Sequence, residues 1–546
     1  MWDAATDRHK IAEYDRRGYV AAVGAMGTVG ATRLSSSRPV TVGLHETNNY
    51  DHSTAYKVGS HVPLTRVAAP PPPPHQHYFS QERHQCIYNK LNWAKISAAL
   101  AVSLGPFAAG LGKGYSSPAI ASIQEKQQYA LHTGNYSGTF LVSPQQASWV
   151  ASLSLLGALF GAIFGGIAMR FGRKRVLVFT SIPFSLSWFV TVFANSVEVM
   201  FATGFVGGFC CAIVLLVSQV YISEIAGPDI RGCLSAVLKI FGHIGVLISF
   251  AIGAYLDWRQ LAFVIAGAPL MLLMSILYIP ETPSYLVLSG REQEAAQALR
   301  WLRGPHADIQ PELATLRDNV LASRAFRPTD RQSISVVLHP ILITCGLMLF
   351  QRFSGANAFN FYAVSIFRQT FGGMDPHGGA VAVAFVQLLA SLLSGLLIDT
   401  VGRLPLLIAS SVFMSIALAA FGSFAYYEHI HRDRVAAQYD WIPLLCVLVF
   451  TIAFSMGISP ISWLLIGELF PLEYRGLGSA LATSFSYACA FIGVKTFVDF
   501  QQMLGLHGAF WLYAAISVCG LCFVVCFVPE TKGKGLDEMD HKYVRA

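Results

Sequence analysis

Residues 165–174 of the chain read GGIAMRFGRK, and residues 395–404 read GLLIDTVGRL. In each stretch a glycine is followed seven residues later by a Gly-Arg pair, and each stretch closes a long apolar run. About 20 apolar residues are what a helix needs to cross a hydrocarbon core about 30 Å thick, at a rise of 1.5 Å per residue. The same ending on two such runs indicates a membrane protein built from a duplicated unit.

The composition agrees with a membrane protein. Of the 546 residues, 54% are hydrophobic and only 13% are charged, against about 25% charged in soluble domains. This excludes a simple soluble globular protein. The formal net charge of +7 is too small for this length to indicate a nucleic-acid-binding surface, so no nucleic-acid partner is predicted.

Twelve predominantly apolar segments of roughly 18 to 25 residues are long enough to span a bilayer. They start near Ile96, Ala147, Val176, Val199, Leu234, Leu261, Val336, Gly379, Leu404, Trp441, Leu477 and His507. A more polar stretch separates the first six from the last six. The predicted fold is therefore an all-α membrane protein with twelve transmembrane helices in two six-helix repeats, joined by a cytoplasmic loop.

Two further motif pairs support the duplication. Glu224 and Glu468 each stand seven residues before an Arg-Gly pair, and Pro-Glu-Thr recurs at 280–282 and 529–531. Together with the opening pair, these motifs occur in the same order in both halves. Parallel repeats of this kind place a substrate site on the axis between them, near the bilayer midplane.

Five regions follow from this organisation. They are a disordered cytoplasmic tail at 1–94, a six-helix bundle at 95–281, a cytoplasmic linker with short helices at 282–335, a second six-helix bundle at 336–528 and a cytoplasmic tail at 529–546. The first tail is polar and lacks a long apolar run. Its five prolines at 70–74 could bind an aromatic groove on a partner protein or serve only as a stiff spacer.

Orientation follows from the loops. Lysine and arginine concentrate in loops two, four, six, eight and ten, which places these loops and both termini in the cytoplasm. The N-glycosylation sequon at Asn135 then falls in the first external loop. We expect a multi-pass protein of the plasma membrane, although a sequon is equally compatible with an internal membrane.

Acids and arginines recur at the predicted cytoplasmic helix ends. Opposite charges there can pair when that mouth is closed and separate when it opens, which makes a breakable latch. The alternative is that the arginines merely follow the positive-inside bias, which leaves the matched glutamates unexplained. The predicted gate residues are Arg173, Glu224, Arg231, Asp399, Arg403, Glu468 and Arg475.

Three strings resemble the sugar porter family of the major facilitator superfamily. They are QRFSGANA at 351–358, GELFP at 467–471 just after Trp463, and PETKGK at 529–534. The strings KTF at 495–497 and HGAFWL at 507–512 are similar to the facilitated trehalose transporters and their glucose-facilitator relatives. The resemblance implies the major facilitator fold and transport of a sugar such as trehalose or glucose by alternating access.

The resemblance also implies a binding site. Gln351 and Asn357 would bond sugar hydroxyls, and Trp463 would stack on a sugar face. The substrate-binding residues implied are Gln351, Asn357, Trp463, Tyr362, Gln387, Lys239 and Arg352. Alternatively, the amides hold neighbouring helices together and the tryptophan only packs.

The spacing of the two amides predicts a break in the seventh span. Gln351 and Asn357 lie six residues apart, so on a straight helix they would point about 120° apart. Both can face one cavity only if the helix unwinds, which Gly355 permits. A second kink is expected at Pro460, in the tenth span.

Some positions depart from the family pattern. Met169 and Gly204 replace an acid or amide and an arginine of the gate region. Lys113, Lys239 and Arg352 put three cations within spans, where each would cost about 2.5 to 3.5 kcal/mol at a lipid-facing helix centre. They must therefore face protein or water. Such charge would favour an anionic substrate or hold one conformation until a ligand arrives, unless the cations snorkel or pair with acids on other helices.

The same spans bear on whether transport is coupled to protons and on whether the chain is an enzyme. No Asp or Glu lies mid-span, so the usual proton carrier of a symporter is missing. No P-loop, metal cluster or nucleophile-base set is present, so we predict no cofactor, no metal site and no enzyme activity. The predicted function is facilitated diffusion of a sugar. The alternatives are transport of a small organic anion and a sugar sensor that binds without transporting.

Overall fold

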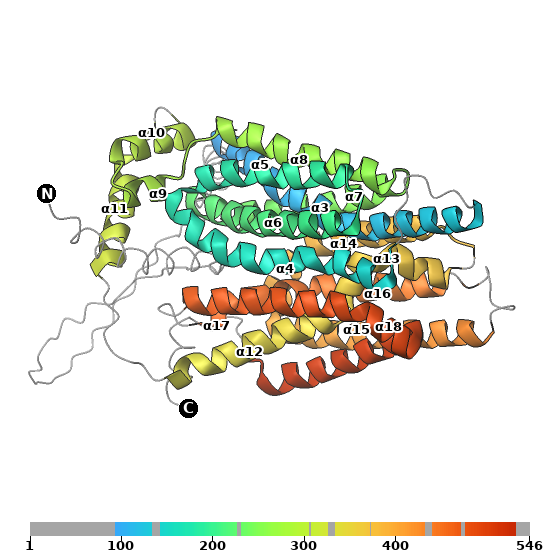
Figure 1. Cartoon of the computed structure of the whole chain (residues 1–546). Coiled ribbons are helices and arrows are strands. Elements are labelled where there is room, and N and C mark those ends of the chain that lie inside the picture. Colours follow the sequence, from blue (N-terminus) through green and yellow to red (C-terminus); the bar gives the residue numbers. More distant parts are fainter. Residues whose placement is uncertain are drawn as a thin grey trace, which may run out of the picture. The chain divides into compact units, whose positions relative to one another are not determined.

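The structure is a computed structural model. The residues that it describes are 93–133, 142–226, 231–304, 307–325, 334–371, 373–431, 439, 441–470 and 475–530. All regular secondary structure in these ranges is helical (Figure 1). The proline run, the sequon at Asn135 and almost all of both predicted tails lie outside them.

Six long helices form the first half and seven helices form the second. The first half comprises α3 (Trp93–Thr133), α4 (Pro144–Ala168), α5 (Arg173–Val192), α6 (Val197–Ile225), α7 (Arg231–Gly253) and α8 (Trp258–Tyr278). The second comprises α12 (Ile334–Phe353), α13 (Ala356–Thr370), α14 (Pro376–Val401), α15 (Arg403–Ile430), α16 (Trp441–Met456), α17 (Ile458–Leu469) and α18 (Arg475–Phe527). Between them lie the short helices α9 (Pro283–Leu288), α10 (Glu292–Arg303) and α11 (Gln310–Ala325).

The prediction of twelve spans is confirmed. Ten helices in the described part of the chain are long and apolar enough to cross a membrane. One of them, α18, contains two spans that meet at the non-helical Gly505. The seventh span is divided between α12 and α13. Eleven of the predicted starts lie within three residues of a helix start, and the twelfth lies two residues after Gly505.

Glycines bring the helices of the first half close together. A Cβ atom on Gly157 would lie 2.0 Å from the Phe205 oxygen, and one on Gly208 would lie 1.9 Å from the Ser154 oxygen. Only glycine therefore allows α4 and α6 to touch backbone to backbone. Small residues at helix contacts are typical of membrane bundles, where close van der Waals packing replaces the hydrophobic effect.

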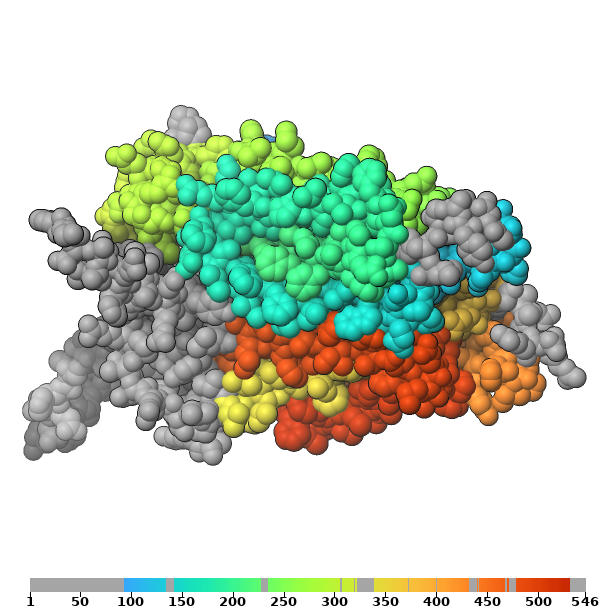
Figure 2. All heavy atoms as spheres, viewed as in Figure 1, coloured from blue at the N-terminus to red at the C-terminus, as the bar shows by residue number. Residues whose placement is uncertain are grey.

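The halves touch along three helix pairs, which are α3 with α13, α4 with α18 and α7 with α14. The α4–α18 contact is visible where the cyan and red surfaces meet (Figure 2). We call the end of the bundle that carries α9–α11 the linker end and the opposite end the far end (Figure 1). Antiparallel succession puts the starts of α5 and α15 and the last residues of α8 and α18 at the linker end.

Two spans are broken, both as predicted. Gly355 has φ of 87° and separates α12 from α13, which confirms the predicted break. The kink expected from Pro460 is also present, one turn before the proline, because a proline ring clashes with the carbonyl four residues earlier. The chain breaks three residues earlier at Gly457, where a Cβ atom would lie 2.2 Å from Ser410 of α15. Pro460 lies in the first turn of α17, where a missing N–H costs no helical hydrogen bond.

Candidate functional site

A cavity of about 330 Å³ lies between the two halves. Helices α3 to α7 line one side, and residues of α12, α13 and α18 line the other. Its volume is within the range of about 300 to 1,000 Å³ that is usual for small-molecule sites. The cavity is therefore the candidate binding site.

Three cations of the spans line this one cavity. Lys113 comes from α3, Lys239 from α7 and Arg352 from α12. Arg352 donates from Nε to the Ser486 hydroxyl at 2.8 Å, and its guanidinium carbon lies 5.9 Å from the Trp463 ring centroid. Lys113 and Lys239 are exposed and have no hydrogen-bond or ion-pair partner among the described residues.

The rest of the lining offers aromatic and neutral polar groups but no acid, as far as the described residues show. His243 joins α7 to α14, with its Nε2 atom 3.1 Å from the Ser391 hydroxyl. Asn357 lines the cavity and donates from Nδ2 to the Arg352 carbonyl at 3.2 Å. Bulky rings and a few polar groups fit a polar ligand with an apolar face.

Trp188 is a site residue that the sequence reasoning missed. It lines the cavity from α5, and its ring packs edge-on against Tyr115 at 4.8 Å between centroids. Its indole N–H is buried without a hydrogen-bond partner. A tryptophan in a span was the only available signal, because an indole N–H normally finds an acceptor.

Four predicted substrate-binding residues are absent from the cavity lining. Gln351 donates from Nε2 to the carbonyls of Ile458 and Ser459, at 3.2 and 3.0 Å, and so joins α12 to α17. Tyr362 stacks on Phe497 and donates to the Val494 carbonyl at 3.3 Å. The other two are Gln387, which is buried, and Trp463, which reaches the site only through Arg352. Of the predicted set, Asn357, Lys239 and Arg352 line the cavity.

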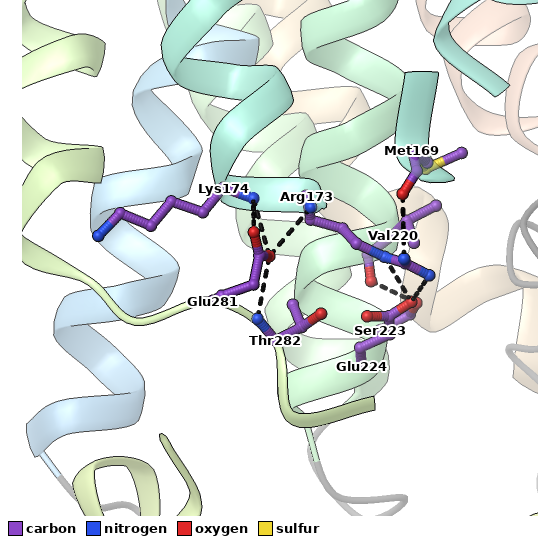
Figure 3. Close-up of polar contacts among 8 residues, drawn as sticks. All are labelled: Met169, Arg173, Lys174, Val220, Ser223, Glu224, Glu281 and Thr282. Atoms are coloured by element: carbon purple, nitrogen blue, oxygen red, sulfur yellow. Dashed lines mark hydrogen bonds and ion pairs between the residues drawn. The ribbon is translucent and has the colours of Figure 1, made fainter. Parts of the chain in front are cut away.

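Charges at the linker end pair within the first half (Figure 3). The Arg173 guanidinium and the Glu224 carboxylate are 2.6 Å apart, and both are largely buried. The Glu281 carboxylate accepts from the backbone N–H groups of Arg173, Lys174 and Thr282, at 3.0, 2.9 and 3.1 Å. Glu281 thus caps the start of α5, where a negative charge also favours the helix dipole.

The second half repeats this cap. The Glu530 carboxylate accepts from the backbone N–H groups of Arg403 and Leu404, at 3.2 and 2.9 Å. Both helix starts follow a glycine with positive φ, 115° at Gly172 and 112° at Gly402. The side chains of Arg231, Asp399, Glu468 and Arg475 lie outside the described set, so pairing across the predicted gate stays a prediction.

Polar contacts at the far end join the two halves. Gln145 of α4 donates to the Asp499 carboxylate at 2.5 Å and accepts from the Lys495 ammonium at 3.0 Å, both on α18. Arg368 of α13 forms an ion pair with Glu125 of α3. At the linker end, by contrast, no hydrogen bond or ion pair between the halves occurs among the described residues. Among the described residues, contacts that cross between the halves therefore occur at the far end, while those at the linker end stay within one half.

Known proteins resemble the chain over most of its length. A family model described as "Sugar (and other) transporter" matches residues 98–543. The facilitated trehalose transporter Tret1 of Drosophila pseudoobscura pseudoobscura is 39% identical over 456 residues, which cover 82% of this chain and 51% of that protein. Tret1 of Polypedilum vanderplanki is also 39% identical over 456 residues, covering 82% and 88%. The chain thus spans about half the length of the Drosophila relative.

Solved structures agree on the fold. The xylose transporter XylE from E. coli in an inward open conformation superimposes with a TM-score of 0.67 at 22% identity, covering 82% of this chain and 99% of that chain. The proton:xylose symporter XylE bound to 6-bromo-6-deoxy-D-glucose gives 0.63 at 23% identity, with the same coverage. At such identities the likeness establishes the major facilitator fold and nothing more specific.

Proposed function

Because the chain belongs to the sugar transporter family, we propose that it is a facilitative transporter that moves a sugar through the membrane by alternating access. Trehalose and hexoses such as glucose are the first candidates, since similar proteins bear the name of facilitated trehalose transporter. The observation that carries the proposal is a cavity between the two halves, lined from both of them, with polar contacts between the halves at the far end and, farther in, between His243 and Ser391.

The arrangement supports an inward-facing state. We assign the linker end to the cytoplasm, because the linker segment is rich in arginine and the positive-inside bias applies. The far end would then be external, closed by Gln145 with Lys495 and Asp499. Opening that end requires these bonds to break, whereas the contacts of Arg173 and Glu281 stay within one half and can persist.

The cavity supports transport without proton coupling. A symporter needs a titratable carboxylate that exchanges its proton during the cycle. No Asp or Glu belongs to the cavity lining in the part of the chain that the structure describes. Sugar would therefore move down its own gradient. We place this transport in the plasma membrane and propose no enzyme activity.

Uptake into proteoliposomes tests this function. Purified full-length protein is reconstituted, and labelled trehalose and glucose are offered with and without an imposed pH gradient. We expect saturable uptake that stops at equal concentrations and ignores the pH gradient. Accumulation above the external concentration under a pH gradient would instead establish a symporter. Binding of the sugar without any uptake would favour the sensor, the alternative to which the departures at Met169 and Gly204 point.

A further inference from the structure

We propose that the cavity selects sugars that carry an anionic group, a carboxylate or a phosphate, and that Lys113, Lys239 and Arg352 bind this group. The inference rests on the proposed sugar transport and specifies the class of sugar. It starts from the composition of the cavity lining. Three cations from three helices line one cavity, and no acid lines it with them, as far as the described residues extend.

Snorkelling does not explain Lys113. Its side chain lines the cavity between the halves and does not lie on a lipid-facing surface of α3. Its ammonium group therefore belongs to the cavity, where water or a ligand has to solvate it.

Pairing within the protein does not neutralise the lysines either. Neither Lys113 nor Lys239 forms a hydrogen bond or an ion pair with any described residue, while Lys126 and Lys495 elsewhere on the same bundle do. Lys113 also lies within electrostatic range of both Arg352 and His243. The cations therefore add their fields instead of cancelling an acid, and a bound anion is the natural counter-charge.

Arg352 is positioned to orient such an anion. Its Nε bond to Ser486 and its approach to Trp463 fix the guanidinium, while no described residue accepts a hydrogen bond from its two terminal nitrogens. A guanidinium with free terminal N–H groups matches the geometry of a carboxylate or phosphate. The two lysines line the same cavity from the other half of the molecule and add compact positive charges to it.

The rest of the cavity suits the sugar body. The rings of Trp188 and Tyr115, which pack edge-on against each other, offer apolar surface to a sugar ring. The anion would sit where the halves meet, because Lys113 and Lys239 belong to the first half and Arg352 to the second. Such a ligand relieves repulsion across the cavity and so favours the conformation that closes around it.

Equilibrium binding in detergent tests the inference without requiring transport. Full-length protein is offered labelled glucose, glucuronate and glucose 6-phosphate at one ionic strength. We expect at least one of the two anionic sugars to bind about tenfold more tightly than glucose or better, since charge-assisted hydrogen bonds are about twice as strong as neutral ones. The preferred anion identifies carboxylate or phosphate as the group recognised. Added salt should weaken binding of that anion and leave glucose unaffected.

Lysine variants test which residues cause the preference for an anionic sugar. Lys113→Gln combined with Lys239→Gln should remove most of the anion's advantage over glucose. Lys126→Gln is the matched control on the same helix. Its ammonium lies outside the cavity lining and pairs with Asp257 at 2.7 Å, so it should bind both sugars like the wild type.

The possible results separate the two proposals. Glucose binding as tightly as both anionic sugars would overturn this inference and leave the proposed function standing. No binding of any sugar would overturn both. Should the double lysine variant fail to fold, the comparison of charged and neutral sugars in the wild type, together with its salt dependence, still decides the matter.

Discussion

The two ends of the helix bundle use their charges in opposite ways. At the linker end, Arg173 pairs with Glu224, and Glu281 caps α5, all within the first half. At the far end, Gln145 bonds to Asp499 across the halves, and Arg368 pairs with Glu125 in the same manner. Among the described residues, the charged groups of the linker end thus pair within one half. The contacts of Gln145 and of Arg368 cross between the halves at the far end, and we call them the fastener.

Contacts within one half and contacts between the halves should therefore have different effects on the protein. A contact within one half moves with that half as a rigid body, so it stabilises the fold in every conformation. A contact between halves exists only while that end is closed, so it contributes to the balance between conformations. Changes at the linker end should therefore alter stability, and changes at the far end should alter which state is populated.

The largest effect is expected from Glu224→Ala. This change leaves the buried Arg173 guanidinium without its partner, and breaking a buried ion pair on one side costs about 3 to 5 kcal/mol. The apparent melting temperature in detergent should fall strongly. Glu294→Ala, in the exposed pair with Arg291, should leave it nearly unchanged. An unchanged melting temperature together with altered access to the cavity would make the pair a gate and contradict the distinction.

A smaller effect on state, rather than stability, is expected from Gln145→Ala. The variant loses the bonds to Lys495 and Asp499, which should favour opening of the far end by about tenfold, or ~1.4 kcal/mol. Cys211 lines the cavity and reports the change through its rate of reaction with an anionic, membrane-impermeant thiol reagent applied from the far side. Cys211→Ser defines the background.

The neighbouring glutamine provides the control for that experiment. Gln146 accepts only from the Ser143 N–H at the start of its own helix. Gln146→Ala should therefore leave the labelling rate of Cys211 unchanged. Equal acceleration by both variants would indicate that fraying of α4, and not loss of the fastener, opens the far end.

The next largest effect is expected from Glu281→Gln, which weakens the cap on α5. Loss of a charged cap at a helix start costs about 1 kcal/mol. Because the Glu530 carboxylate caps α15 through the same two backbone positions, Glu530→Gln should lower the apparent melting temperature by a similar amount. Neither change should alter the labelling of Cys211 from the far side. Unequal losses would mean that the two repeats no longer use this cap equally.

The fold could be predicted because its signals are local. Apolar length alone located the spans. The break at Gly355 was predicted from two amides that were expected to share one cavity, although only Asn357 of the two lines it. The gate shows where local signals stop. Sequence spacing marked Arg173 and Glu224 as gate residues, but that they pair with each other inside one half depends on how α5 packs against α6.

The site was only partly predictable for a related reason. Lys239 and Arg352 were recognisable because a charge in a span must face water or protein, and both line the cavity. Gln351 carried the same kind of polar signal, yet its amide joins α12 to α17. Trp188 carried almost none, because an apolar helix such as α5 does not reveal which face meets the cavity. A polar side chain in a span is recognisable from the sequence as one that needs a partner. Whether that partner is another helix or a ligand depends on how the helices pack.

The smallest effect is expected from Lys126→Gln. This variant tests whether a charged pair restrains opening because it lies at the far end or because it joins the two halves. Lys126 lies in the far part of α3, but its partner Asp257 precedes α8 in the same half, and both side chains are about half exposed. An exposed pair contributes less than about 1 kcal/mol, and a pair within one half does not resist opening. Both the melting temperature and the labelling of Cys211 should stay near the wild-type values. Faster labelling in this variant would mean that any charge at the far end restrains opening, and the fastener could no longer be equated with the contacts that cross between halves.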